Sequence, residues 1–424
     1  MTEKTRERVL PFDEALSAVL AQARSFGLPG KRESLPLLEA AGRVLAQAIA
    51  AERDQPPFDR STRDGYAVRA ADIASGRALR VAGSIRAGER WQGQPLAAGE
   101  ALEIMTGAPL PAGAEAVLMV EHTALEGDAL RVAEGRTVRV GENVVPRGAE
   151  AREGDSLLPV GRVLGAAELA VAASCGCASL EVFARPVAAV ISTGDELVEL
   201  NTVPEPWQIR NSNSYALVSL VQTEGGEAHQ LPIARDTLED LRERIAQGRE
   251  SDLLLLSGGV SMGKYDLVEQ VLTESGAEFF FTGALIQPGK PVVFGRLPKG
   301  AASQQVSKSA SQWTYFLGLP GNPVSTQVCF HLFAAPLLKA LAGRSDLVPR
   351  FVEARLAEDV KGGARVTRFL PAELVSAWDG VTVRVIGWQG SGDVAANARG
   401  NCYAVLPVGA EVFRAGETVR VLLR

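Results

Sequence analysis

A run of four leucines, Leu253–Leu256, passes directly into a glycine-rich turn, and this junction strongly constrains the fold. A short apolar run of this length is typical of a strand buried on both faces, as in a parallel sheet. The turn, residues 257–266, reads SGGVSMGKYD, and a helical pattern follows over residues 267–272. The sequence therefore predicts a strand, a turn at its carboxyl end and a helix.

The composition of this turn suggests that it binds an anion. Glycines let backbone N–H groups approach a ligand closely, and a helix N-terminus carries a partial positive charge. Together with Lys264 these groups would hold a phosphate, while Asp266 is suited to holding a metal ion or orienting a hydroxyl group. The alternative is an ordinary turn between a strand and a helix, with Asp266 as a helix cap.

Strands and helices alternate from residue 185 to residue 343, which predicts a three-layer parallel α/β domain over residues 185–348. We expect strands at 187–191, 230–233, 252–256, 292–294 and 315–317, and helices at 214–222, 238–247, from 266 and at 324–341.

The remaining sequence, in a chain of 424 residues, is too long to share one core with that domain. Short β-like runs between Gly and Pro predict a β-rich insertion domain over 54–154. Helical spacing at 12–26, 37–51 and 161–173 predicts a discontinuous helical domain built from 1–53 and 155–184. Residues 349–424 are expected to form a small β-barrel. The fold class is thus multidomain α/β plus β.

Composition narrows the functional classes. A net charge of −6 argues against nucleic-acid binding, and the absence of an apolar run near ~20 residues argues against a membrane partner. The N-terminal residues lack a signal-peptide core, and four cysteines are too few for a disulfide framework. We therefore expect a cytoplasmic protein with reduced thiols.

Three further turns of the α/β domain resemble the first in kind. They are 191–196 (ISTGDE), 287–291 (QPGKP, with Lys290) and 318–325 (GLPGNPVS, with Pro323 at or near the first helical position). In a doubly wound sheet such turns converge on one edge, so the sequence predicts a binding site there.

Acidic side chains among phosphate-binding groups predict a cation, and Mg²⁺ prefers oxygen ligands. The candidates are Asp195, Glu196, Asp236 and Asp266. For each of them a helix cap or a solvated charge is the alternative.

The insertion domain has a dense polar loop at 56–67 (PPFDRSTRDGYA), which would hold an anion or form ion pairs within itself. Residues 105–109 (MTGAP) add the hydroxyl of Thr106 at a turn.

Several chemistries are disfavoured. Three histidines give no His-based triad or zinc site, and Cys175-Gly176-Cys177 is better explained as two core or turn thiols than as a metal site. Neither GxxxxGK[ST] nor GxGxxG occurs, which argues against a simple ATPase or a dehydrogenase.

In combination and in order, these motifs resemble the molybdopterin molybdenumtransferase family, the enzymes related to the E domain of gephyrin. The likeness covers essentially the whole chain. The motifs are PPFDRSTRDGYAV from Pro56, MTGAPLP from Met105, ENVVPRG from Glu142, STGDEL from Ser192, SGGVSMGKYD from Ser257, QPGKP from Gln287, GLPGNPVS from Gly318 and GNCYAVLP from Gly400.

The resemblance implies four domains, with the α/β domain as the molybdopterin-binding one, in an elongated homodimer. The active site would lie between the α/β domain of one subunit and parts of the other. The implied reaction inserts molybdate into the dithiolene of adenylylated molybdopterin with Mg²⁺ as cofactor, releasing AMP and forming molybdenum cofactor. The molybdopterin adenylyltransferase is an implied delivery partner.

The resemblance also assigns roles by motif position. The functional acids and the threonine fall on Asp64, Thr106, Glu196, Asp236 and Asp266, and the metal would be held by Glu196, Asp236 or Asp266. Substrate contacts fall on Gly258, Gly259, Ser261, Lys264, Lys290, Pro320, Pro323 and Glu150.

Three positions depart from the family pattern. Glu150 stands where the family usually has Asp, Gln287 replaces a common Lys, and Arg63 replaces an apolar residue. These changes bear on anion affinity and on the preference for molybdate or tungstate.

Two other functions are alternatives to the insertion of molybdate. One is a molybdopterin adenylyltransferase, which would consume Mg-ATP, because its α/β unit is similar. The other is a non-catalytic scaffold of the gephyrin type, which would bind peptides. Retention of Glu196, Asp236 and Asp266 argues against the scaffold.

Overall fold

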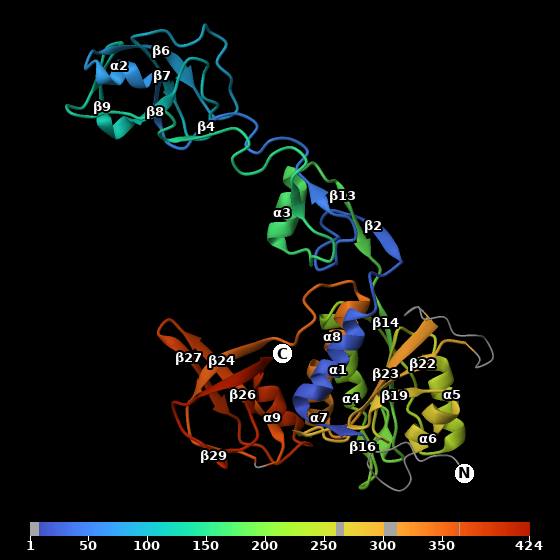
Figure 1. Cartoon of the computed structure of the whole chain (residues 1–424). Helices are drawn as coiled ribbons and strands as arrows, with labels where there is room; N and C mark the ends of the chain where they lie inside the picture. Colours follow the sequence, from blue (N-terminus) through green and yellow to red (C-terminus); the bar gives the residue numbers. More distant parts are fainter. Residues whose placement is uncertain (1–7, 260–266, 301–311, 364) are drawn as a thin grey trace.

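The computed structural model describes residues 8–259, 267–300, 312–363 and 365–424. The molecule is elongated (Figure 1). The insertion domain occupies one end, a small middle unit follows, and the α/β and C-terminal domains lie at the other end.

The α/β domain is built on a six-stranded sheet. Its order is β17 (Glu227–Gln230), β14 (Val187–Ser192), β18 (Leu253–Ser257), β23 (Trp313–Leu319), β22 (Val293–Pro298) and β19 (Glu278–Phe281). The first four strands are parallel, as expected, whereas β22 runs antiparallel to β23 and β19 antiparallel to β22.

The leucines of β18 explain why the domain has three layers. Leu253 and Leu255 belong to the core on one face and Leu254 and Leu256 to the core on the other, and all four are fully buried. Burying each leucine side chain contributes about 1.5–3 kcal/mol, so both faces must be covered. One face is covered by α1 (Phe12–Arg24), α4 (Asn213–Thr223) and the helix α7–η3–α8, and the other by α5 (Leu238–Gly248) and α6 (Leu267–Glu274).

The helix over the first face consists of α7 (Pro323–Cys329), a π-helical turn η3 (Phe330–Ala334) and α8 (Ala335–Leu341). It is long and apolar enough to cross a membrane, but 89% of its most apolar window is buried inside the protein. It therefore serves as a core helix here.

The middle unit combines two separate stretches of the chain. Its elements are β2 (Arg32–Pro36) paired with β13 (Ser179–Phe183), β3 (Ile49–Ala50) paired with β12 (Ser156–Leu158), and α3 (Ala166–Ser174). The helix α1, which the sequence assigned to this unit, packs instead in the core of the α/β domain.

The helix predicted at 37–51 is wrong, because the segment forms turns and the short strand β3. Its backbone N–H groups bond to distant carbonyls: Leu45 donates to Arg162 at 2.9 Å and Ala46 to Glu181 at 2.8 Å. Gly42 has φ of 73°, which a helix excludes. Long-range pairing thus outweighs the local helical spacing.

The insertion domain is a six-stranded sheet with one short helix, α2 (Ala70–Ala74). Its strand order is β8 (Ala116–Met119), β5 (Gly65–Val68), β7 (Glu100–Ile104), β6 (Leu79–Ile85), β10 (Ala129–Val132) and β9 (Thr123–Glu126), and η1 (Val120–His122) precedes β9.

The C-terminal domain is a closed five-stranded barrel. Its strands are β24 (Phe351–Leu356), β26 (Thr367–Ala377), β27 (Gly380–Val385), β28 (Cys402–Leu406) and β30 (Thr418–Leu423), with α9 (Val394–Arg399) beside them. The strand β21 (Ile286–Gln287) of the α/β domain pairs with β26, which places Gln287 opposite Arg368.

Short pairs complete the fold. They are β1 (Val9–Leu10) with β20 (Gly283–Ala284), β4 (Arg60–Ser61) with β11 (Val144–Val145), β15 (Leu197–Val198) with β16 (Ile209–Arg210), and β25 (Val360–Lys361) with β29 (Val412–Phe413).

A buried histidine makes the contact between the helix and the barrel sensitive to pH. His331 of η3 is buried near Tyr403 of β28, and among the described residues nothing bonds its Nε2. Burial, with Arg424 and Lys339 nearby, lowers the pKa of His331 to about 4. The unfolded chain, with an ordinary histidine pKa, takes up the proton first, so stability is lost as pH falls from about 6.5 to about 4.

We expect His331→Phe to remove this loss. Between pH 7 and pH 4 the wild-type free energy of unfolding should fall by about 2–4 kcal/mol more than that of the variant. Urea unfolding at both pH values measures the difference. Parallel pH dependence of the two proteins would contradict a neutral buried imidazole.

Candidate functional site

The ends of three parallel strands are aligned in one row. Ser192 at the end of β14 pairs with Ser257 at the end of β18, and Ser257 pairs with Leu319 at the end of β23. The turns that follow these strands therefore start at the same edge of the sheet, as the sequence predicted for a parallel arrangement.

The fourth turn, 287–291, reaches this edge for a different reason. It precedes β22 and does not follow it, so a parallel β22 would have placed it at the opposite edge. Because β22 is antiparallel, with Val293 opposite Gly318, its beginning lies beside the end of β23. The expected convergence thus depends on a strand direction that the sequence analysis did not predict.

A cavity of ≈ 630 Å³ lies at this edge. It brings together six of the predicted site residues: Glu196, Asp236, Gly258, Gly259, Pro320 and Pro323. Other turns and the C-terminal domain supply the rest of its lining: Thr193, Gly194, Leu197, Ile209, Arg210, Asn211, Ser212, Asn213, Ser257, Pro291, Gly321, Asn322, Gly392 and Val394.

The glycines of the cavity are needed because backbones meet there. Gly258 has φ of 97°, and a Cβ added to it would lie 2.4 Å from the carbonyl oxygen of Thr193. A Cβ on Gly259 would lie 2.7 Å from Val268 Cγ2. Only glycine allows the turn after β18 to lie directly on the turn after β14.

The acids of the cavity are held by the neighbouring turns. Asp236 accepts a hydrogen bond at Oδ1 from Thr193 Oγ1 at 2.7 Å, and its own N–H donates to Asp195 Oδ1 at 3.3 Å. Asp195 therefore holds the backbone at Asp236 in place, and it is not among the residues that line the cavity. The Glu196 carboxylate lies over Gly194, where an added Cβ would be 2.5 Å from Glu196 Oε2. In the described part of the chain no three His, Cys, Asp or Glu residues form a metal cluster.

Asn213, at the start of α4, joins two turns and was missed as a site residue. Its Nδ2 donates to Ser257 Oγ at 2.8 Å and to the Gly321 carbonyl at 2.7 Å. The side chain that accepts a hydrogen bond from the Ser214 N–H is that of Asn211. The polar run 211–214 was the only available signal.

A second cavity of ≈ 490 Å³ adjoins the first and shares Pro291, Pro320 and Asn322 with it. Lys290 lines this cavity, together with Ser325 from α7. The C-terminal domain contributes Arg368, Trp388, Gly390 and Ser391, all of which the sequence analysis missed. The cavity therefore has cations from two domains.

Three predicted site residues belong to the insertion domain, which lies at the opposite end of the molecule from the α/β domain (Figure 1). The N–H and the Oγ1 of Thr106 both donate to Asp64 Oδ1 at 2.7 Å, and these bonds, the backbone one first, lower the pKa of Asp64. Glu150 pairs with Arg60 at 2.9 Å, so this arginine of the loop 56–67 has its ion pair with a residue outside the loop. Within one chain these residues do not line either cavity. Ser261, Lys264 and Asp266 lie outside the described residues.

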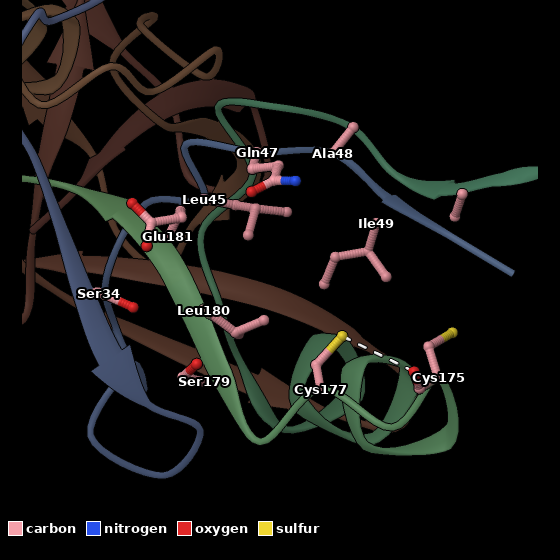
Figure 2. A pocket seen from close by; sticks show the side chains of 11 residues that line it. Ser34, Leu45, Gln47, Ala48, Ile49, Cys175, Cys177, Ser179, Leu180 and Glu181 are labelled. Carbon is pink, nitrogen blue, oxygen red and sulfur yellow. Dashed lines mark hydrogen bonds between the residues drawn. The ribbon is translucent and has the colours of Figure 1, made fainter. Parts of the chain in front are cut away.

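A further cavity, of ≈ 370 Å³, lies in the middle unit (Figure 2). Cys175 and Cys177 line it with Ser34, Glu181 and apolar side chains. Burial raises the pKa of the Cys177 thiol, which favours its protonated form. Since no Lys or Arg is among its described lining residues, this cavity is poorly suited to an anion.

Comparison with known proteins agrees with this arrangement. Three family models match in succession: the MoeA N-terminal region (domain I and II) over residues 10–176, a probable molybdopterin binding domain over 189–340, and the MoeA C-terminal region (domain IV) over 353–423. The second of these matches includes all residues of the α/β domain that line the two adjoining cavities.

The molybdopterin molybdenumtransferase of Nostoc sp. is 35% identical over 401 residues, which are 92% of this chain and 88% of the relative. The chain belongs to this family. The enzyme of the same name from Staphylococcus aureus (strain Mu50) is 32% identical over 98% of this chain and 95% of its own length.

Solved structures of family members show the same fold. A molybdopterin biosynthesis MoeA protein from Pyrococcus horikoshii has a TM-score of 0.78 at 29% identity, covering 98% of this chain and all of its own. Another structure of that protein gives a TM-score of 0.73 at 32% identity, with 98% and 99% coverage. The multidomain fold class predicted from the sequence is thereby confirmed.

The contact at Gly258 yields a test of the site. We expect Gly258→Ala to lower the free energy of unfolding by about 1–3 kcal/mol and to abolish ligand binding, because Cβ collides with the Thr193 carbonyl. Gly225→Ala is the matched control: its φ is 89°, yet nothing lies within 4 Å of an added Cβ. Urea unfolding and calorimetric AMP binding compare the two. Equal affinity of both variants for AMP would contradict the close packing of the turn at Gly258 against the turn at Thr193.

Proposed function

We propose that the protein inserts molybdate into the dithiolene of adenylylated molybdopterin and releases AMP, forming molybdenum cofactor. The observation that carries this proposal is the pair of adjoining cavities on one rim. One is lined by glycine turns and carboxylates, and the other by two cations.

The cationic cavity is suited to molybdate. Lys290 and Arg368 approach it from different domains, and Ser325 and Ser391 add hydroxyl donors. Burial lowers the pKa of Arg368, but a guanidinium stays charged at neutral pH. A small tetrahedral oxyanion matches two cations and hydroxyl groups.

The larger cavity is suited to the phosphoanhydride of the adenylylated pterin. The exposed backbone at Gly259 and Gly321 is suited to phosphate oxygens, whereas the Gly258 N–H already donates to the Leu319 carbonyl at 3.1 Å. Arg210 adds a positive charge. Asn213 holds two of these turns in place, so the donors are positioned before the substrate arrives. In the reaction water adds to one phosphorus while the anhydride bond breaks and AMP leaves.

The donors present fit Mg²⁺, which we include in the proposal. Glu196 and Asp236 line one cavity, and no described residue donates to Asp236 Oδ2. Two carboxylates beside a phosphate are typical of a magnesium site. When bound, Mg²⁺ would polarise a phosphate oxygen. Glu196 and Asp236 would orient the attacking water and keep the local charge balanced.

The distant acids fit the proposal if two copies of the chain combine. Asp64 and Thr106 are hydrogen-bonded to each other in the insertion domain, which lies at the far end of the molecule. We propose a homodimer in which the insertion domain of one subunit brings these residues to the rim of the other. We also propose a cytoplasmic location and delivery of substrate by the molybdopterin adenylyltransferase.

Direct turnover tests the reaction. Purified protein with adenylylated molybdopterin, molybdate and Mg²⁺ should release AMP as cofactor forms. Glu196→Ala should reduce the rate at least about a hundredfold while the protein stays folded. Glu239→Ala, which removes an exposed carboxylate at the start of α5, should have no effect. AMP is followed by chromatography.

The same assay separates the alternatives. Consumption of ATP with unadenylylated molybdopterin would indicate an adenylyltransferase. Unchanged AMP release by Glu196→Ala would show that this acid takes no part in the mechanism. If the wild type shows no turnover, the non-catalytic scaffold is the function that remains.

Mixing two inactive variants tests the composite site. Asp64→Asn and Glu196→Ala should each be inactive, but half of randomly mixed dimers hold one variant of each kind. Such a dimer has one intact site, so the mixture should recover about a quarter of the wild-type rate. AMP release after unfolding and refolding the mixture together measures recovery. No recovery, with dimers present by light scattering, would place both acids in one chain's site.

A further inference from the structure

The loop 199–208, which we call the strap, joins β15 to β16 at the rim of the larger cavity. Its ends are fixed to the site: the N–H of Ile209 donates to the Glu196 carbonyl at 2.9 Å, and that of Asn211 to the Val198 carbonyl at 3.0 Å. Arg210 Nε also donates to the Leu200 carbonyl at 3.0 Å. The strap is therefore held at the backbone of Glu196, a residue that lines the larger cavity.

The strap exposes unusually large apolar side chains. Trp207 is 72% exposed, Val203 84% and Ile209, which follows the strap, 57%. Ile209 lines the cavity, and so does Val394 from the start of α9, which is also exposed. Apolar groups from two domains thus border a cavity whose floor is polar.

The cavity itself offers little to a flat ring. Its described lining residues include no aromatic side chain, and its floor is formed by glycine, serine, asparagine and carboxylate groups. An adenylylated pterin carries two planar heteroaromatic rings joined by phosphates. Trp388 lines the adjoining cavity, which is proposed above for molybdate. If the phosphates lie on the glycine turns, a ring must extend toward the apolar rim, where Trp207 stands two residues before the lining residue Ile209.

We propose that Trp207, two residues before the lining residue Ile209, binds a planar heteroaromatic ring of the substrate by stacking. This inference rests on the proposed function, because the ring belongs to the adenylylated pterin. Stacking accepts any flat ring, since each presents a π-face, and the phosphates fix which ring lies there. Trp207 is thus a substrate-binding residue that favours the adenylylated substrate over a simple anion.

Binding measurements on the full-length protein test the proposal. Loss of a stacking aromatic weakens binding roughly 5- to 150-fold, so Trp207→Ala should raise the Kd of AMP or of molybdopterin by that factor. Trp207→Phe should restore most of the affinity. Trp378→Ala is the matched control, because Trp378 is fully exposed in the turn between β26 and β27. Calorimetry with AMP alone and with molybdopterin alone tells which ring is stacked.

Kinetics give a second readout. Trp207→Ala should raise KM for adenylylated molybdopterin by a similar factor with kcat nearly unchanged, because the ring is held equally in the ground and transition states. A fall in kcat at constant KM would overturn the assignment.

Other results would also overturn it. Unchanged affinity of Trp207→Ala for both AMP and molybdopterin would remove the stacking role, as would a wild-type protein that binds neither. Dissociation of a dimer into monomers by Trp207→Ala, seen by light scattering, would assign the strap to a subunit interface. Failure of the proposed reaction is distinguishable: AMP affinity would still depend on Trp207 while the wild type released no AMP from substrate.

Discussion

The alignment of strand ends in the central sheet is the constraint on which the rest of the structure depends. Ser192, Ser257 and Leu319 are paired side by side across the sheet. The turns after β14, β18 and β23 therefore begin next to one another. Burial of β18 on both faces fixes this register, because a slip of one residue would exchange the leucines between two different cores. The antiparallel β22 then adds the turn that carries Lys290 to the same edge.

Along this edge the acidic and the basic side chains gather in different cavities. This separation is compatible with a polyanionic substrate in one cavity and a small oxyanion in the other. Carboxylates of Glu196 and Asp236 lie in the larger cavity, and the cations Lys290 and Arg368 lie in the neighbouring one. The barrel is tied to the edge by the pairing of β21 with β26. Residues that are distant in sequence thus line adjoining cavities, because two domains share a short ladder.

Much of the α/β domain was predictable because its signals are local. Local sequence is enough to indicate three features: the buried strand β18, the glycine turn after it, and the start of α7 at Pro323. The direction of β22 depends on which neighbour it pairs with, and residues 37–51 are shaped by bonds to Arg162 and Glu181. Arg368 and Asn213 carry no motif of their own, so only the tertiary fold reveals them at the site.

Hydrogen–deuterium exchange with AMP and molybdate tests most directly whether the four turns form one binding site. The account predicts slower amide exchange on ligand addition in 193–197, 257–259, 289–291 and 320–323 together. Protection confined to the insertion domain or to the cavity beside Cys175, with these four segments unchanged, would contradict it.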